Sequence, residues 1–256
     1  MTIHKAVNIA FVLSVLSVLL TAYFYDFSLW WLLLVVVLYL FVLMLGTVRI
    51  GMRFFMESYT HGSRKDKMVA LTFDDGPDLH TAEVAGCLSR HGVTGAFFLI
   101  GHKVVANPEV VKKLHEAGHV VGNHGYHHRW NYPLRPTPEI QEEMRLTSVA
   151  IKDATRLETH FFRPPFGITN PRIAKAVRAQ NLISVGWDVR SFDTVLGTSQ
   201  RFSNRLKRKV RNGSIILLHD TGEGMVGFLD SFIPWLKEQG YQIVSLEILI
   251  HEKAYQ

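Results

Sequence analysis

The chain opens with two long stretches of apolar residues, residues 6–25 and 27–48, which are separated by Asp26. Neither stretch contains a charged residue, and each has about the ~20 residues that a helix needs to cross the hydrocarbon core of a bilayer. Aromatic side chains gather around the break, as expected at a membrane interface: Tyr23, Tyr25, Trp30 and Trp31. The pattern predicts two transmembrane helices in a tight hairpin. An uncleaved signal sequence followed by one anchor is the alternative.

Basic residues flank this hairpin and are absent from its loop. Only Lys5 precedes the first stretch, whereas Arg49, Arg53, Arg64, Lys65 and Lys67 follow the second. Because Lys and Arg on short flanks favour the cytoplasmic side, both ends of the hairpin and the domain that follows are predicted to lie on the cytoplasmic side of a bacterial inner membrane. A periplasmic or extracellular orientation is the alternative. We interpret residues 1–48 as the hairpin, 49–66 as a basic juxtamembrane linker, and 67–256 as one globular domain.

From residue 67 onward, short apolar runs alternate with segments of helical periodicity. The apolar runs predict seven strands: 68–73, 96–100, 119–122, 160–163, 182–189, 214–218 and 241–249. The intervening segments predict helices: 81–91, 108–117, a long one from residue 137, 171–180, 199–211 and 227–239. This alternation favours an α/β fold with a parallel sheet, most simply a closed or nearly closed barrel. An open doubly wound sheet is the alternative, and it would hold its site at one switch point.

Polar side chains follow the ends of several predicted strands, which favours the barrel: Asp74, Asp75, His124, His128, Arg163, Asp193 and His219. Such a set supplies metal ligands, a spare carboxylate base and a separate acid, as metal-assisted hydrolysis requires. The single Cys87 excludes an intrachain disulfide. The net charge of +6, without a nucleic-acid-binding motif, is better suited to anionic lipid headgroups than to nucleic acid.

Asp74 and Asp75 stand where the first strand ends and Gly76-Pro77 forces a turn. Neighbours in a regular strand point to opposite faces, but this rule relaxes at the last residue. Both carboxylates are therefore expected to face one pocket, where one binds a metal and the other accepts a proton from its bound water. An Asp pair that only caps the turn is the alternative.

His124 and His128 are four residues apart. On a continuing strand they would lie roughly 13 Å apart, whereas on a helical turn they come within about 6 Å and can bind one ion. Gly122 and Gly125 give the backbone freedom to turn. We therefore expect a single helical turn here, with His127 pointing elsewhere.

Arg163 begins a segment, Arg163 to Gly167, in which two prolines fix the direction of the backbone. Its guanidinium could hold a carboxylate by a charge-assisted bond, and the N–H of Phe166 could donate to a developing oxyanion. His219 ends an apolar run, and a nearby carboxylate such as Asp193 would favour its protonated form, as a general acid requires. A rigid surface loop and a structural histidine are the alternatives.

Residues from about 68 to 249 resemble the polysaccharide deacetylases of carbohydrate esterase family 4, which include nodulation-type chitooligosaccharide deacetylases and peptidoglycan deacetylases. The resemblance rests on four segments in the family's order: Thr72-Phe73-Asp74-Asp75-Gly76-Pro77, Asn123-His124 through His128, Phe162-Arg163-Pro164-Pro165-Phe166-Gly167, and Leu217-Leu218-His219. It implies a distorted, incomplete (β/α) barrel of about seven parallel strands, which the two predicted transmembrane helices precede here.

The resemblance also implies a role for each site residue. The implied catalytic residues are Asp74 as base, Arg163 as its support, His219 as acid and Asp193 as the support of that acid. The implied metal ligands are Asp75, His124 and His128. The ion is usually Zn²⁺, with Co²⁺, Ni²⁺ or Mn²⁺ as alternatives. The implied substrate-binding residues are Phe166, Leu217, which lines the acetyl-methyl pocket, and Thr194.

Three positions depart from the family pattern. Gly125 replaces a Ser or Thr, Arg190 stands where many members are acidic, and Thr194 replaces a Trp that usually closes the acetyl pocket. The expected function is metal-dependent removal of N-acetyl groups from amino sugars of a glycan or a lipid-linked saccharide. The alternatives are a deformylase or O-deacetylase acting on a lipid-linked sugar or a cell-wall polysaccharide, and an inactive membrane-anchored carbohydrate-binding module.

Overall fold

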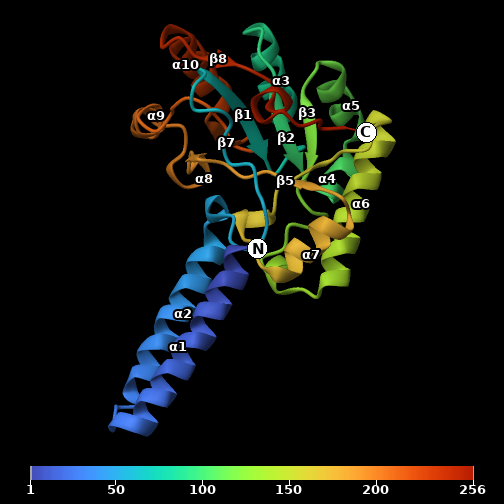
Figure 1. Ribbon diagram of the computed structural model, residues 1–256. Helices are drawn as coiled ribbons and strands as arrows, with labels where there is room; N and C mark the ends of the chain where they lie inside the picture. Colours follow the sequence, from blue (N-terminus) through green and yellow to red (C-terminus); the bar gives the residue numbers. More distant parts are fainter. Residues whose placement is uncertain (1, 256) are drawn as a thin grey trace.

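The computed structural model describes residues 2–255 of the chain. Two helices, α1 (Ile3–Tyr25) and α2 (Trp30–Val48), pack against each other and project from one end of the globular part (Figure 1). Both are long and apolar enough to cross a membrane, judged by length and composition. Most of their large apolar side chains are exposed, for example Leu13 and Leu38. The pair therefore has the features predicted for the hairpin.

The globular part is built on one curled parallel sheet. Its main strands are β1 (Met68–Asp74), β2 (Gly95–Leu99), β3 (Val120–Asn123), β4 (Phe161–Phe162), β5 (Ile183–Ser184), β6 (Val189–Arg190) and β7 (Ile215–His219). Their spatial order is β5-β4-β3-β2-β1-β7-β6, and every pairing along this path is parallel. A further strand, β8 (Gln242–Ile243), pairs with the first residues of β1. The predicted incomplete α/β barrel is confirmed.

Helices cover the outside of this sheet (Figure 1). They are α3 (Thr81–Arg90), α4 (Gly101–Ala106), α5 (Pro108–Glu116), α6 (Thr137–Thr155), α7 (Pro171–Ala179), α8 (Asp193–Leu196), α9 (Gln200–Lys207), α10 (Met225–Glu238) and α11 (Leu246–Ile250). Short 3-10 turns lie at Ile50–Met52, Tyr132–Leu134 and Pro165–Gly167.

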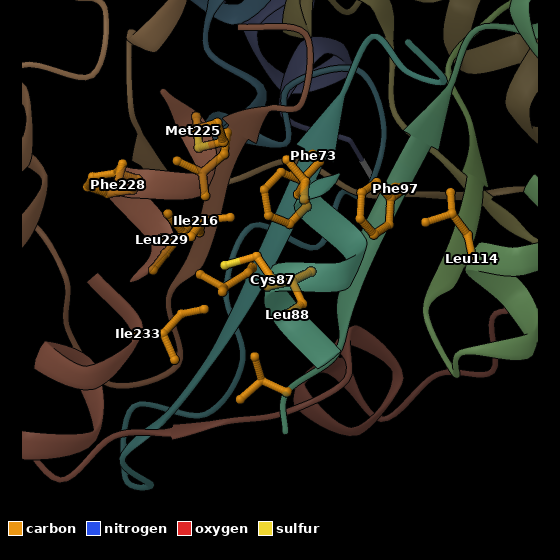
Figure 2. Close-up of a cluster of buried hydrophobic side chains, with 14 of the residues drawn as sticks. Phe73, Cys87, Leu88, Phe97, Leu114, Ile216, Met225, Phe228, Leu229 and Ile233 are labelled. Carbon is orange, nitrogen blue, oxygen red and sulfur yellow. The ribbon is translucent and has the colours of Figure 1, made fainter. Parts of the chain in front are cut away.

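The largest hydrophobic cluster lies between the sheet and the helices α3 and α10 (Figure 2). Phe73 of β1 and Phe97 of β2 stack with ring centroids 4.9 Å apart, and Leu88, Ile216 and Ile233 pack in the same cluster fully buried. Burial of each such side chain contributes about 1.5–3 kcal/mol to folding. This packing fixes the strands whose carboxyl ends carry the polar residues.

Residues 182–189 do not form the single strand that the sequence predicts. They form two short strands, β5 and β6, at opposite edges of the sheet, and the chain between them crosses the remaining gap. The side chain of Arg163 donates to the carbonyl oxygens of Val185 and Gly186 in that crossing, so side-chain hydrogen bonds hold the backbone between the two strands. A pattern of apolar residues does not reveal such a side-chain partner.

Residues 241–249 are also not one strand. Strand β8 is followed directly by helix α11, whose buried residues Leu246, Leu249 and Ile250 recur at the helical spacing of three and four. The short apolar run was compatible with both structures, and the spacing of these three residues decides for the helix.

The segment 49–66, predicted as a linker, packs against the globular part. Phe54 and Phe55 are buried in one hydrophobic cluster with Phe162 of β4 and Ile173 of α7. Further along, the N–H of Tyr59 donates to the carbonyl oxygen of Ser184 over 2.9 Å. The hairpin is therefore joined to the sheet by a packed segment.

Candidate active site

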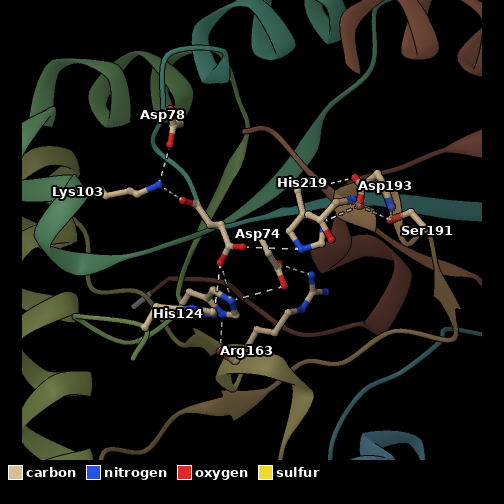
Figure 3. Close-up of polar contacts among 11 residues, drawn as sticks. Asp74, Asp78, Lys103, His124, Arg163, Ser191, Asp193 and His219 are labelled. Carbon is tan, nitrogen blue, oxygen red and sulfur yellow. Dashed lines mark hydrogen bonds and ion pairs between the residues drawn. The ribbon is translucent and has the colours of Figure 1, made fainter. Parts of the chain in front are cut away.

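Strand β1 delivers two carboxylates to the same place. Asp74 is its last residue, and Asp75 adopts a left-handed conformation with φ 74°, so the alternation of strand side chains ends there. The Nε2 atom of His124 lies 3.7 Å from Oδ2 of Asp74 and 3.5 Å from Oδ1 of Asp75 (Figure 3). Both carboxylates thus face one pocket, as expected from the turn.

His124 and His128 meet through an irregular loop after β3, and the expected helical turn is absent from the described residues of this loop. The backbone turns at Gly125 (φ 78°) and at His128 itself (φ 52°), which brings the two rings to 4.9 Å between centroids. His128 Nε2 lies 3.4 Å from Oδ1 of Asp75. The two rings therefore meet as expected from the spacing of four residues, but two residues in the left-handed conformation bring them together instead of a helical turn.

Glu143 of α6 braces this loop from below. Its buried carboxylate accepts the N–H groups of Tyr126 and His127 over 3.2 and 3.1 Å, and it pairs with Arg135 at 3.0 Å. The side-chain oxygen of Asn123 accepts the N–H of Gly125 over 2.9 Å. These bonds hold the loop although Gly125 provides no side-chain hydroxyl.

The geometry of Asp75, His124 and His128 fits a divalent ion. One ligand atom from each lies within 4.8 Å of the other two, and Oδ1 of Asp75 is buried without a hydrogen-bond partner among the described residues. Ligand pairs 3.4 and 3.5 Å apart match tetrahedral coordination with bonds of about 2.0–2.2 Å. Nδ1 of His124 lies 2.8 Å from the carbonyl oxygen of Arg163, a contact that directs Nε2 of His124 toward the carboxylates.

Electrostatics in this group favour the ligand forms of Asp75 and His128 at neutral pH, whereas, although burial opposes it, Asp74 and Asp75 raise the pKa of His124. Burial opposes ionisation of Asp75, but the nearby imidazoles of His124, His128 and His219 bring the pKa of Asp75 well below its usual range. Burial and then the charge of His124 lower the pKa of His128 to about 4, which leaves this ring neutral. A carboxylate and a neutral imidazole are the forms that bind metals.

A second group of ligand atoms is less suited to a metal. Cys87, His91 and Asp230 also have ligand atoms within 4.8 Å of one another. Burial and the hydrogen bond to Asp230 raise the pKa of Cys87 to about 11, so its thiol stays protonated. The guanidinium of Arg90 lies 3.6 Å from the same carboxylate of Asp230 and competes with a cation there.

Arg163 is fully buried and holds Asp74. Its Nη1 donates to Oδ1 of Asp74 over 2.6 Å and to the hydroxyl of Thr72 over 2.8 Å. The guanidinium also lies over the ring of Phe98, 4.0 Å from its centroid. Because Oδ1 of Asp74 is occupied, Oδ2 is the oxygen that faces the ligand group.

His219 and Asp193 form the opposite side of the pocket. Nδ1 of His219 lies 2.7 Å from Oδ1 of Asp193, which also accepts the hydroxyl of Ser191 over 2.8 Å (Figure 3). The backbone N–H of His219 donates to the other carboxylate oxygen over 2.7 Å. Burial opposes the charge of the imidazole, but the hydrogen bond at Nδ1 and the charge of Asp193 raise the pKa of His219. Nε2 of His219 lies 3.9 Å from Oδ2 of Asp75, so it faces the ligand group.

The three expected substrate-binding residues lie around these two sides. Phe166 is 43% exposed, and its ring lies 4.5 Å from that of His128. Leu217 is buried in β7, two residues before His219. Thr194 lines a cavity of about 400 Å³ beside His219, together with Gly197, Thr198 and Gly222. Arg190 packs over the rings of Trp187 and Phe192.

Two residues that the sequence analysis did not single out hold the turn at Asp75. Lys103 donates to the carbonyl oxygen of Asp75 over 2.8 Å and to Asp78 over 2.7 Å (Figure 3). Asp220 accepts the hydroxyl of Thr81, and it lies so close to Gly76 that an added Cβ would be 2.4 Å from its Oδ2. Burial raises the pKa of Asp220 to about 7. The position of Asp220 directly after His219 was the available signal.

Comparison with protein-family models identifies residues 61–184 as a polysaccharide deacetylase domain. The chain is 32% identical over 195 residues to the peptidoglycan-N-acetylglucosamine deacetylase PgdA of Listeria monocytogenes, a match that covers 75% of this chain but 40% of that enzyme. It is 30% identical over 203 residues to the peptidoglycan-N-acetylmuramic acid deacetylase PdaA of Bacillus subtilis, covering 77% and 76% of the two chains.

Solved structures show the same likeness. The Bc1960 peptidoglycan N-acetylglucosamine deacetylase superimposes with a TM-score of 0.73 at 31% identity, covering 78% of this chain and 95% of that one. BA3943 of Bacillus anthracis, a pseudoenzyme of the same family, gives a TM-score of 0.71 at 29% identity, covering 77% and 72%. A mutant of BA3943 has restored enzymatic activity. The present chain belongs to the polysaccharide deacetylase family, carbohydrate esterase family 4.

Proposed function

We propose that this protein is a metal-dependent hydrolase that removes N-acetyl groups from amino sugars of a glycan or a lipid-linked saccharide. The observation that carries the proposal is the arrangement of a carboxylate and an imidazole on two sides of one ligand group. Asp74 and His219 both face Asp75, His124 and His128, at the distances given above. Amide hydrolysis requires a base for the attacking water and an acid for the departing amine.

Asp75, His124 and His128 would hold the metal, with Zn²⁺ as the expected ion and Co²⁺, Ni²⁺ or Mn²⁺ as alternatives. When bound, a divalent ion supplies polarisation of the amide carbonyl and a lowered pKa for water. The remaining steps fall to the side chains and backbone of this chain.

Asp74 is the proposed base. Its Oδ2 faces the pocket and would accept the proton of the attacking water, while Arg163 keeps Oδ1 in place. The guanidinium of Arg163 also places a positive charge beside this carboxylate. The N–H of Phe166 is placed in a left-handed turn (φ 61°) and would donate to the developing oxyanion.

His219 is the proposed acid. Asp193 raises the pKa of His219 and so favours its protonated form, in which Nε2 would donate a proton to the leaving amine. Leu217 and Thr194 would line the space taken by the acetyl methyl group, and the cavity beside Thr194 leaves room around it.

The test is release of acetate and free amine from a panel of acetylated glycans and lipid-linked sugars. Wild type should release both products in equal amounts, and Asp74→Asn, which keeps the shape but removes the base, should lose about 10²–10⁴-fold in kcat/KM. The exposed Asp230→Asn is a matched control and should keep wild-type turnover. Equal turnover by wild type and Asp74→Asn would reject the proposal.

The same panel decides among the alternatives. Formylated and O-acetylated sugars test the deformylase and O-deacetylase, which the open cavity beside Thr194 allows. The likeness to BA3943 makes an inactive carbohydrate-binding module a second candidate. That candidate predicts saccharide binding without product release by wild type, although Asp74, His219 and the three ligand residues are all present.

The side of the membrane is the remaining part of the proposal. The charges that flank the hairpin favour a cytoplasmic catalytic domain, and a substrate there would be a membrane-carried precursor. The relatives PgdA and PdaA are peptidoglycan deacetylases, which favours an external domain acting on the wall. A reporter enzyme fused after Gln256 that is active only in the periplasm would overturn the cytoplasmic orientation.

A further inference from the structure

One hydrophobic cluster joins the hairpin to the catalytic domain. Val42 of α2 packs in the same cluster as Phe54, Phe55 and Ile173 of α7. Gly46 lies so close to Phe54 that an added Cβ would be 2.4 Å from its ring. Packing of this density excludes a free tether, so the direction of the hairpin fixes the orientation of the catalytic domain.

The length of α2 indicates how far the active site lies from the hydrocarbon core of a membrane. Its 19 residues span about 28 Å, close to the ~30 Å of a bilayer core, so Thr47 in its last turn lies at the edge of the hydrocarbon. The N–H of Thr169 donates to the carbonyl oxygen of Thr47 over 3.0 Å. Phe166 is three residues before Thr169 and therefore within about 11 Å of it. Since the ring of Phe166 lies against His128, the ligand group is close to the headgroup level.

The loop beside this contact exposes apolar side chains. Trp130 is 80% exposed and Leu134 is 66% exposed. The loop is held next to the end of α2, because Asn170 donates to the carbonyl oxygen of Pro133 and Arg172 to that of Leu134, both over 2.6 Å. The ends of β1 to β3 point toward the same side (Figure 1). Trp is typical of membrane interfaces, and an exposed Leu beside it would be shielded by lipid.

Basic residues lie on the elements that carry or adjoin these two apolar side chains. Arg49 directly follows α2, Arg129 precedes Trp130, and Arg172 and Lys175 lie on the exposed side of α7. Helix α7 contains no acidic residue. The exposed acids close in sequence pair with other arginines: Glu57 with Arg53, and Glu139 with Arg135. The net charge of this surface is therefore positive, which attracts anionic headgroups.

We propose that this membrane-facing surface rests on an anionic phospholipid bilayer, and that the active site takes an amino sugar carried by a lipid at that bilayer. We define the surface as Arg49, Arg129, Trp130, Leu134, Arg172 and Lys175. The second half of the proposal rests on the deacetylase function proposed above. A saccharide on a lipid carrier reaches a site at headgroup level while its tail stays in the bilayer, whereas the hairpin prevents the site from turning toward a distant glycan.

The first experiment measures the depth of this surface and needs no turnover. The full chain is placed in nanodiscs of phosphatidylcholine and phosphatidylglycerol. A nitroxide label is attached at Leu134→Cys, in a variant that also has Cys87→Ala. The control label is at Ile248→Cys on α11, which follows β8 at the amino end of β1 and is 56% exposed. Paramagnetic relaxation should show the label at 134 accessible to oxygen and shielded from a water-soluble nickel complex, and the label at 248 the reverse. Equal access of the nickel complex to both labels would overturn the surface.

The second experiment tests the substrate class with a matched pair of double variants. Leu134→Asp with Lys175→Glu changes the membrane-facing surface, and Ile248→Asp with Lys253→Glu makes the same changes on the opposite side. The probes are N-acetylglucosamine on an isoprenoid phosphate in the nanodisc and a soluble N-acetylglucosamine tetramer. The first variant should lose about tenfold in kcat/KM on the lipid probe and keep its rate on the tetramer, while the control variant should be unaffected.

The results of these two experiments distinguish failure of the membrane proposal from failure of the deacetylase proposal. Unchanged turnover of the lipid probe by the first variant, or an equal loss on both probes, would overturn the substrate class. If the label at 134 remained in water and the protein bound purified cell wall, the surface would be a binding site for a finished glycan and the membrane proposal would be overturned. If wild type released product from no saccharide, the deacetylase proposal would fail, while the depth of the label at 134 would still decide the surface.

Discussion

The two sides of the site are built differently. On the metal side, Arg163 and His124 are almost completely buried, and Glu143 and Lys103 fix the loops that carry the ligands. On the acid side, His219 depends on a single carboxylate and borders a cavity of about 400 Å³ lined largely by small residues. A braced group of ligands sets one chemistry, and an open cavity leaves room for different acyl groups and sugars. We infer from this difference that one part of the fold determines the reaction and another part determines which substrate is accepted.

The largest expected effect is removal of a metal ligand. Asp75→Asn should reduce turnover to the level of the protein stripped by a chelator, because the ligand group loses its only carboxylate. Added Zn²⁺ should restore the stripped wild type and not the variant. Metal content by atomic absorption and acetate release measure the two effects. Full activity of Asp75→Asn would contradict the assignment of a metal side and an acid side to this site.

Arg163→Lys tests how far the metal side depends on its bracing. Lys cannot reproduce the bonds from Nη1, Nε and Nη2 of Arg163 to Asp74, Val185 and Gly186. We expect kcat to fall about 100-fold with little change in KM, together with a lower Tm. The exposed Arg145→Lys, whose partner Glu142 lies on the same helix, is the matched control. A variant of Arg163 with a wild-type rate would contradict the role of the guanidinium as support for the base.

Asp193→Asn tests the acid side through pH. Asp193 raises the pKa of His219, so the acid form persists to higher pH and is lost as pH rises through that raised pKa. Without the charge of Asp193 the pKa falls, and the alkaline limb of kcat/KM should move to lower pH, with about tenfold less activity at neutral pH. An alkaline limb that stays in place would show that another group limits the rate.

Glu143→Gln tests the loop that carries His124 and His128. The amide keeps the size of the side chain but weakens the bonds to the N–H groups of Tyr126 and His127. Support of this kind is worth about 10–100-fold in metal affinity, so we expect the zinc Kd to rise within that range. Glu142→Gln, one residue away and exposed, should leave the Kd unchanged.

The smallest expected effect concerns Asp220, which directly follows His219 on the acid side and lies against Gly76 on the metal side. Its pKa is raised to about 7 from an ordinary 3.8, so the stability it contributes is present below about pH 4 and is lost as pH rises through 7. Asp220→Asn cannot ionise, and its Tm should therefore change less with pH over this range than that of wild type. Parallel curves for the two proteins would mean that this carboxyl does not link folding to pH.

Much of the fold followed from the sequence because strands and helices alternate along most of the globular part, and the site residues stand at strand ends. The failures have physical causes. A side chain, Arg163, binds the backbone of 185 and 186 and separates β5 from β6, which no pattern of apolar residues reports. The loop between His124 and His128 uses left-handed residues where a helical turn was expected.

The supports of the site were harder to predict than its ligands. Ligands are rare residue types at recognisable spacing, whereas Glu143 lies in the middle of a helix and resembles the exposed acids around it. Only tertiary packing places Glu143 beneath the loop at Tyr126 and His127. Lys103 was missed for a different reason, because α4, which carries it, was not predicted from the sequence.

A metal titration tests the central claim most directly. Calorimetry of the chelator-treated full chain with Zn²⁺ should show one tightly bound ion per chain, and this binding should be lost in His124→Ala. The matched variant is His91→Ala with Asp230→Asn, which disables the second group of ligand atoms and should bind zinc as wild type does. Tight binding that survives His124→Ala and disappears in the matched variant would contradict the account.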